Sequence, residues 1–209
     1  MSSMRRTLVP LVALGGLALG GVALEALPAG ADRPIASARL RLADGTGIGK
    51  VVFHDRGANT RVEVRLRVPA GTTSVRAFHG FHVHANNDPA NGTGCVADSS
   101  QASATWFVSA DGHLKTGTEV HGNHTGDLTS LHLNSDGLAD ASFLIDRVEP
   151  AALGGTAVIF HAGPDNFGNI PLGTASDQYT ANDPAAIDKT QKTGNAGDRV
   201  ACGLVKAGD

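Results

Sequence analysis

The stretch that decides the fold is Val62-Glu63-Val64-Arg65-Leu66-Arg67-Val68, in which apolar and charged side chains alternate without a break. A period of two is typical of a β-strand that buries one face and leaves the other in water. Residues 38–42 alternate in the same way. Further short segments of strand character are residues 50–54, 78–84, 128–133, 139–145, 157–161 and 200–205. Turn signals such as Ser135-Asp136-Gly137 separate these segments, and no segment shows a long helical period. Eight short strands predict a single all-β domain, a β-sandwich or flattened barrel.

Two long stretches interrupt this pattern. Residues 85–127 are rich in Gly, Asn, Thr and Ser, and residues 162–198 are equally polar, with Asp, Asn, Gly and Pro throughout. Loops of this length inside a compact domain are usually functional or disordered, and the histidines in and beside the first one favour function. We therefore expect two long functional loops on a β scaffold.

The N-terminal segment reads as a secretory signal peptide. Arg5 and Arg6 precede an apolar run over residues 8–24, and Ala29-Gly30-Ala31 offers a small-x-small cleavage site. This layout predicts a signal peptide over residues 1–31 and a mature domain over 32–209. An uncleaved membrane anchor is the alternative, because the run approaches spanning length, but Glu25 and the cleavage site disfavour it. We expect a secreted, periplasmic or cell-envelope protein with no stable membrane insertion after cleavage.

Composition narrows the function classes. The 209 residues carry a formal net charge of -3, so no basic surface favours nucleic acid as a partner. Nine histidines stand beside only one Trp and one Tyr, which favours a metal protein. The two cysteines are too few for a disulfide scaffold but enough for one bridge, which export would allow to persist.

The histidines form a pattern that suits metal binding. In His82-Val83-His84, residues two apart on a strand point to the same face, although this signal alone is weak. His161 ends another expected strand. The first long loop adds four donors: His113, His121, His124 and Asp127. Three histidines with one carboxylate are a donor set that zinc favours. A chance cluster of solvated histidines is the alternative.

Three motifs together resemble copper/zinc superoxide dismutase. They are Gly80-Phe81-His82-Val83-His84, the His-x-Gly-Asp at 124–127, and Gly194-Asn195-Ala196-Gly197-Asp198-Arg199-Val200-Ala201-Cys202-Gly203. The similarity extends over about residues 78–205, and Gly112-His113-Leu114 looks like the bacterial, secreted branch of the family, as in actinobacteria. The resemblance implies an eight-stranded Greek-key barrel with two long functional loops.

The resemblance also implies roles for individual residues. Copper would be held by His82, His84, His113 and His161. Zinc would be held by His113, His121, His124 and Asp127, so that His113 bridges the metals. Asp165 would link the two metal sites through ligand histidines, although it could be an ordinary turn carboxylate. Cys95 and Cys202 would form the family's internal disulfide. Arg199 would receive the anion beside copper, although it could simply pair with an acid.

The implied activity is dismutation of superoxide to dioxygen and hydrogen peroxide by copper redox cycling, with Arg199 and His113 as catalytic residues. The stretch from His121 to His124 is shorter than is usual in the family, so a copper-only site is the alternative to copper and zinc. Lys189 and Lys192 are candidates for steering the anion. Two rival functions are an exported copper-buffering protein without efficient turnover and a non-catalytic sandwich module. A homodimer stays open, and residues 171–193 receive no role. His54, His79 and His132 are expected to be structural or surface residues.

Overall fold

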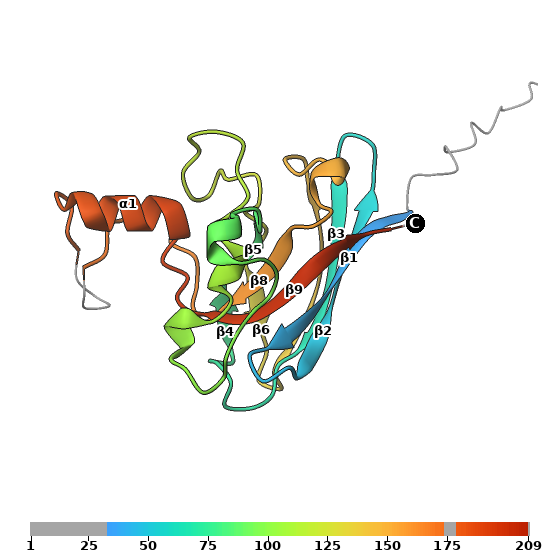
Figure 1. Ribbon diagram of the computed structural model, residues 1–209, viewed down its shortest axis with the longest axis horizontal. Coiled ribbons are helices and arrows are strands. Elements are labelled where there is room, and N and C mark those ends of the chain that lie inside the picture. Colours follow the sequence, from blue (N-terminus) through green and yellow to red (C-terminus); the bar gives the residue numbers. More distant parts are fainter. Residues whose placement is uncertain (1–32, 174–178, 209) are drawn as a thin grey trace, which may run out of the picture.

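The computed structural model describes residues 33–173 and 179–208, and within them the chain is built mainly of β-strands (Figure 1). The expected signal peptide over residues 1–31 lies outside the described residues. The strands are β1 Pro34–Leu42, β2 Gly47–Asp55, β3 Thr60–Arg67, β4 Ala77–His79, β5 Phe81–His84, β6 Leu131–Leu133, β7 Leu138–Ile145, β8 Ala157–His161 and β9 Arg199–Ala207. Short 3₁₀ turns are η1 Pro89–Asn91, η2 Ser103–Thr105, η3 Val108–Ala110 and η4 Pro150–Ala152.

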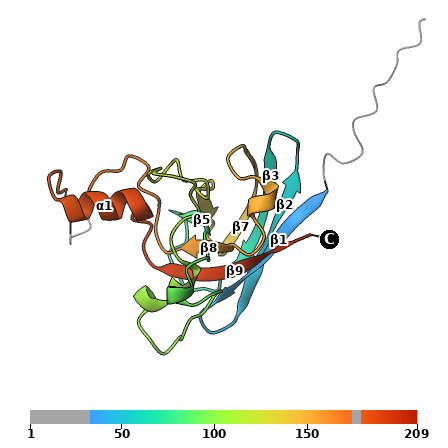
Figure 2. The ribbon, with the colours of Figure 1, turned by 45° about the horizontal axis from the view of Figure 1, so that its top comes forward.

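One antiparallel sheet carries most of the fold. Its strand order is β5-β8-β9-β1-β2-β3-β7, and a separate two-stranded sheet pairs β4 with β6. The sheet is strongly curled, as Figure 2 shows. Only Gly80 separates β4 from β5 along the chain, and a turn over residues 134–137 joins β6 to β7. The small sheet is therefore connected to both edges of the large one, which gives the expected flattened barrel.

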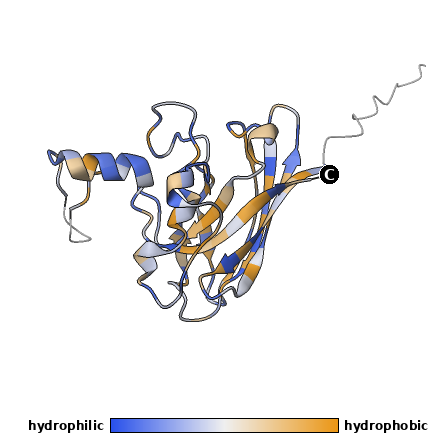
Figure 3. Ribbon diagram, viewed as in Figure 1, coloured by the Kyte–Doolittle hydropathy of each residue, from blue (hydrophilic) through white to orange (hydrophobic). Residues whose placement is uncertain are grey.

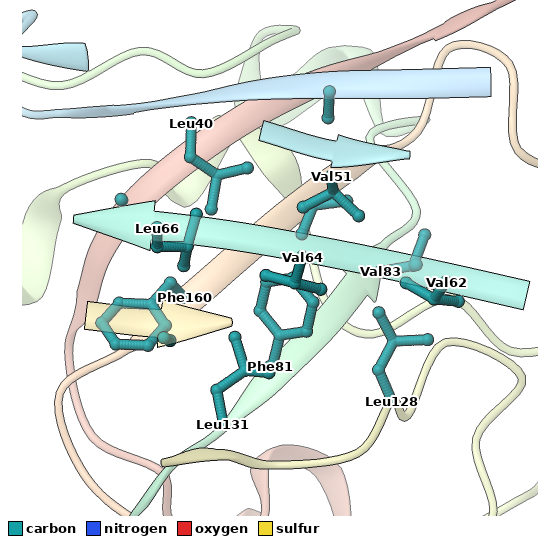
Figure 4. Packing of buried hydrophobic residues seen from close by; sticks show 14 of the residues in the cluster. Leu40, Val51, Val62, Val64, Leu66, Phe81, Val83, Leu128, Leu131 and Phe160 are labelled. Carbon is teal, nitrogen blue, oxygen red and sulfur yellow. The ribbon is translucent and has the colours of Figure 1, made fainter. Parts of the chain in front are cut away.

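The inner face of the curled sheet forms the core. In β3 the predicted alternation holds, because Val62, Val64 and Leu66 are buried while Arg65 and Arg67 are exposed. Phe81 and Phe160 reach the same interior from β5 and β8 (Figure 4). The alternation of apolar and polar residues is visible along the strands in Figure 3. Burial of this apolar surface is the main stabilising term of the domain.

Gly80 explains why the described residues form nine strands where the sequence pattern predicted eight. The expected strand over residues 78–84 divides at Gly80, with β4 on one side and β5 on the other. A Cβ at Gly80 would lie 2.6 Å from Cβ of Ala196 and 2.9 Å from Oδ1 of Asp165. The chain therefore passes very close to the second long loop at this point. The expected strand over 128–133 is also shorter than predicted, since only Leu131–Leu133 pair.

The second long loop contains a helix that the sequence pattern did not predict. Helix α1 spans Pro184–Thr193 and projects from the barrel (Figure 1). Asp183 caps its N-terminus by accepting hydrogen bonds from the backbone N–H groups of Ala185 and Ala186, and Gly194 ends it in a left-handed conformation. Within the described helix only Ala186 and Thr190 are buried, so it has no apolar periodicity to detect. The prediction of no helix was wrong here.

Two further observations bear on the environment of the chain. A disulfide joins Cys95 in the first long loop to Cys202 in β9 across 107 residues of sequence. No helix in the described part of the chain is long and apolar enough to cross a membrane.

Candidate metal centre

Strand β5 presents two buried imidazoles at one end of the sheet. His82 and His84 are fully buried, and their ring centroids are 6.3 Å apart. His161 at the end of β8 and His113 in the first long loop complete a group with them. One ligand atom from each of these four histidines lies within 4.8 Å of every other. The structure thus brings together all four residues of the expected copper set.

The hydrogen bonds of His82, His84 and His161 leave one ring nitrogen of each histidine without a partner. Nδ1 of His84 lies 2.8 Å from the carbonyl oxygen of Asp111, and Nδ1 of His161 lies 3.1 Å from that of Gly197. A carbonyl oxygen only accepts, so Nδ1 carries the proton and Nε2 carries the lone pair. Both Nε2 atoms are buried without a partner, as is Nδ1 of His82. Buried polar atoms are rarely left unpaired, and lone pairs converging in this way suit a metal ion.

A second group surrounds Asp127. Its Oδ1 lies 2.8 Å from Nδ1 of His113, 3.3 Å from Nδ1 of His124 and 3.5 Å from Nδ1 of His121. Zinc–ligand bonds of about 2.0–2.1 Å at tetrahedral angles place neighbouring donors roughly 3.3 Å apart. Each of the three histidines thus lies near this distance from the carboxylate oxygen, and Nδ1 of His113 lies 3.2 Å from Nδ1 of His124. The donor atoms that lie within 4.8 Å of one another here belong to Asp127, His113, His121 and His82, so His82 takes the place of the expected His124 in that group.

The short His121–His124 segment is organised by the other oxygen of the same carboxylate. Oδ2 of Asp127 accepts hydrogen bonds from the backbone N–H of Gly122 at 2.7 Å and of His124 at 3.0 Å. The loop therefore wraps around the carboxylate, and both histidines reach Oδ1 despite their close spacing. Burial raises the pKa of Asp127, but hydrogen bonds from His113, His121 and His124 outweigh it and hold the pKa well below its usual range.

Asp165 connects the two groups. This fully buried carboxylate places Oδ1 2.8 Å from Nε2 of His82 and 3.3 Å from Nε2 of His121, while Oδ2 accepts from the hydroxyl of Ser130. Burial raises the pKa of Asp165, but its hydrogen bonds with His121 and His82 lower it overall. Burial also opposes protonation of His121, yet the two carboxylates raise its pKa to about 9. Asp165 thus contacts one histidine of each donor group, and its role in linking two metal sites stays a prediction.

Arg199 lies at the start of β9 with its guanidinium fixed. Nη1 donates to the carbonyl of Phe107, and Nη2 donates to that of Asp111 at 2.5 Å. Burial, followed by the charges of His113 and Arg199, lowers the pKa of His84 well below its usual value. Arg199 is therefore a fixed cation near the first histidine group. Its bonds to backbone carbonyls do not support the alternative of a simple ion pair with an acid.

Sequence reasoning missed the residues that hold the His121–His124 segment from outside. Arg147 donates to the carbonyls of Gly122 at 2.9 Å and His124 at 3.4 Å. Asn169 donates its side-chain amide to the carbonyl of His121 at 2.9 Å. No motif marks either residue, because each contact depends on the fold. Only the structure could have found them.

The second long loop also packs against the His121 ring. Phe167 stacks on it with centroids 5.3 Å apart, and the carbonyl of Gln191 in α1 accepts its backbone N–H at 2.7 Å. A Cβ at Gly194 would lie 2.3 Å from Nε2 of His121, so only glycine leaves room for the ring. Part of the segment over 171–193 thus helps to hold a predicted metal donor.

The remaining histidines have other contacts. His79 is buried, but both of its ring nitrogens lie 2.9 Å from backbone carbonyls, those of His161 and Ser74. His54 contacts Glu63, and His132 packs against the ring of Phe78. Lys189 and Lys192 are exposed on α1, where Lys192 pairs with Asp188 at 2.9 Å. The steering role of the two lysines stays a prediction.

Comparisons with known proteins agree with the geometry. The family model of copper/zinc superoxide dismutase matches residues 48–205. A relative from Mycolicibacterium paratuberculosis, named as a Cu-Zn superoxide dismutase, is 35% identical over 90% of this chain and 81% of its own. One of the same name from Mycobacterium tuberculosis is 33% identical over 79% of this chain and 67% of its own. A solved SOD-like protein from Bacillus subtilis shares the fold with a TM-score of 0.52 at 22% identity, over 80% of this chain and 94% of its own.

Proposed function

The chain belongs to the copper/zinc superoxide dismutase family and is a superoxide dismutase with copper and zinc as cofactors, and we propose that the two buried donor groups are its metal sites. Copper is assigned to His82, His84, His113 and His161. Zinc is assigned to His113, His121, His124 and Asp127. The copper assignment is carried by the buried, unpaired ring nitrogens of His82, His84 and His161 in a group whose ligand atoms lie within 4.8 Å of one another. The zinc assignment is carried by three imidazole Nδ1 atoms within 3.5 Å of Oδ1 of Asp127.

The reaction consumes two superoxide anions and two protons and yields dioxygen and hydrogen peroxide. Copper, when bound, supplies the redox chemistry by accepting an electron from one anion and returning it to the next. Imidazole nitrogens suit both oxidation states of copper. The residues of this chain must then orient the anion and supply a proton.

Arg199 is proposed to bind and orient the anion. Its two fixed hydrogen bonds to backbone carbonyls leave the remaining N–H groups of the guanidinium available for a small anion. Because the guanidinium is held before substrate arrives, little freedom is lost on binding. We expect Arg199→Ala to lower the rate most at low salt, where its charge is least screened.

His113 is proposed to hold and release a proton at Nε2. Its Nδ1 lies 2.8 Å from Asp127, so the opposite nitrogen serves the copper group. In the state in which Nε2 does not bind copper, it can hold one of the two protons that the reaction needs, and the second proton comes from water. Asp127, together with zinc when it is bound, would fix the orientation of the ring.

The geometry also bears on whether zinc is bound. Three imidazole Nδ1 atoms lie within 3.5 Å of Oδ1 of Asp127 in spite of the short spacing. This arrangement supports zinc over the copper-only alternative.

The first test is the dismutation rate of the purified protein reconstituted with copper and zinc. We expect a rate close to the diffusion limit that falls as ionic strength rises. His84→Ala should lose copper and activity, whereas the exposed-surface control His132→Ala should keep both. Tight copper binding without turnover would favour the copper-buffering alternative instead.

We further propose that the protein is exported, with residues 1–31 as a cleaved signal peptide and 32–209 as the mature domain. The Cys95–Cys202 disulfide supports export, since such bonds persist in oxidising compartments. A relative from Brugia pahangi, 27% identical over 77% of this chain, is named as an extracellular superoxide dismutase. Mass spectrometry of the protein recovered outside the cytoplasm should find Asp32 at its N-terminus. Sedimentation of the same sample distinguishes a monomer from the homodimer that the sequence leaves open.

A further inference from the structure

Asp111 has a backbone conformation that normally belongs to glycine. The residue follows the 3₁₀ turn Val108–Ala110 with φ 63° and ψ -156°. This region is essentially restricted to glycine, because a Cβ there meets the neighbouring backbone. Such a conformation persists only where surrounding contacts hold it. The contacts that hold Asp111 in this conformation therefore indicate its role.

The carboxylate of Asp111 fastens the residue to a neighbouring turn. Oδ2 accepts the backbone N–H of Asn87 at 2.6 Å and of Asp88 at 2.8 Å, and Oδ1 accepts the side-chain amide of Asn91 at 3.0 Å. Hydrogen bonds to a charged acceptor are stronger than neutral ones. Three of them oppose rotation of residue 111 toward a relaxed conformation. A glycine could adopt the same conformation, but nothing would fasten it to the turn.

The carbonyl of the same residue faces the metal centre. Its oxygen accepts from Nδ1 of His84 at 2.8 Å and from Nη2 of Arg199 at 2.5 Å. The first bond sets the tautomer and tilt of a proposed copper ligand, and the second sets the place of the proposed anion-binding guanidinium. Because both bonds end on one oxygen, rotating this peptide plane would release both side chains together.

We propose that Asp111 is a positioning residue that aligns His84 with Arg199, its carboxylate holding a strained peptide whose carbonyl both side chains share. The inference rests on the roles proposed above for His84 and Arg199. Asp111 touches neither substrate nor metal, so its effect passes through those two side chains. A role confined to stability of the loop is the competing explanation.

Three variants separate these explanations. Asp111→Gly removes the three hydrogen bonds of the carboxylate but can adopt the observed φ without strain, so the domain should still fold. Asp111→Asn keeps an oxygen that can accept backbone N–H groups and should restore much of the alignment. Asp98→Asn is the matched control, since Asp98 lies in the same long loop and accepts hydrogen bonds from Ser100 without contacting the centre.

The first readout uses the copper-free protein. Solvent exchange of the Nδ1 proton of His84 and of the guanidinium protons of Arg199 is measured by NMR. We expect Asp111→Gly to speed both by about tenfold, the scale of one lost hydrogen bond to a charged group. Asp111→Asn should lie between this variant and the wild type, and Asp98→Asn should match the wild type.

The second readout uses the copper-loaded protein, with azide as the anion probe. Asp111→Gly should change the Cu²⁺ EPR spectrum and weaken azide binding about tenfold, by the same reasoning. If it lowers only the melting temperature and leaves proton exchange, the EPR spectrum and azide affinity unchanged, the positioning role is wrong. If the wild type lacks dismutase activity, the proposed function fails, while the NMR result on the copper-free protein still decides the role of Asp111.

Discussion

Replacing Asp165 by Asn should weaken binding of both metals by a modest and similar factor. Oδ1 of Asp165 lies 2.8 Å from Nε2 of His82 and 3.3 Å from Nε2 of His121, one histidine in each donor group. An Asn side chain can keep its oxygen at this position and turn its amide toward the hydroxyl of Ser130, which can accept. The contacts of the oxygen with His82 and His121 are then retained, and only the negative charge is lost.

The size of the effect follows from that difference. A hydrogen bond to a charged group is about twice as strong as a neutral one, so losing the charge costs about 1 kcal/mol at each histidine. We therefore expect about fivefold weaker binding of zinc and about fivefold weaker binding of copper. Asp165→Ala leaves both N–H groups without this acceptor and should weaken each metal by about 10- to 100-fold.

Chelator competition measures both affinities, zinc on the copper-free protein and copper on the zinc-loaded protein. Asp98→Asn serves as the control, since it removes a charge at a distance from both donor groups. Equal affinities in the wild type and Asp165→Ala would refute the reasoning. A loss confined to one metal would show that Asp165 does not connect the two sites.

The remaining predictions concern stability, pH and the loop contacts. Replacing both Cys95 and Cys202 by Ser should lower the free energy of unfolding by about 4–5 kcal/mol, because the bond closes a loop of 107 residues; urea unfolding measures this, and an unchanged midpoint would contradict it. In the metal-free protein the pKa of His121 in the folded state is raised to about 9, against about 6.5 in the unfolded state. The stabilisation that protonated His121 contributes is therefore fully present below pH 6.5 and is lost as the pH rises from there through about 9. Thermal unfolding over that pH range should show the decline, and His121→Gln should remove it. For the same reason zinc binding at pH 7 should release a proton, which calorimetry in buffers of different ionisation enthalpy detects. Arg147→Ala should speed zinc dissociation several-fold by freeing the carbonyls of Gly122 and His124, whereas the exposed Arg39→Ala should have no effect; identical dissociation rates in the two variants would argue against a role for Arg147.

The sequence could predict the strands because their signal is local. In β3 the polarity of each residue indicates which face of the strand it lies on. The alternation of Val62, Val64 and Leu66 with charged neighbours is therefore enough to predict the strand. The candidate metal donors were predicted from a family resemblance carried by three specific motifs, and the structure brings most of them close together, while their roles as ligands stay a prediction. Helix α1 had readable end signals in Asp183-Pro184 and Gly194, but its few buried residues left no periodicity between them.

The parts that could not be predicted depend on contacts between distant segments. Gly80 divides a strand because Ala196 and Asp165 lie against it. Arg147 contacts the His121–His124 segment only because the fold brings these distant parts of the chain together. Asp111 could not be predicted either, because no neighbouring residue indicates an aspartate in a glycine-type conformation whose carbonyl accepts hydrogen bonds from two side chains.

The two carboxylate oxygens of Asp127 have different partners, and this difference affects the rate of metal binding. Oδ2 is already engaged by the backbone of Gly122 and His124, so the carboxylate is oriented by the folded chain itself. Because these bonds come from the chain itself, folding of the chain orders the loop and turns Oδ1 toward the imidazoles. Metal capture at this carboxylate then requires loss of water and protons but no loop closure. Its rate should follow the free ion concentration without the plateau that a slow conformational step would impose.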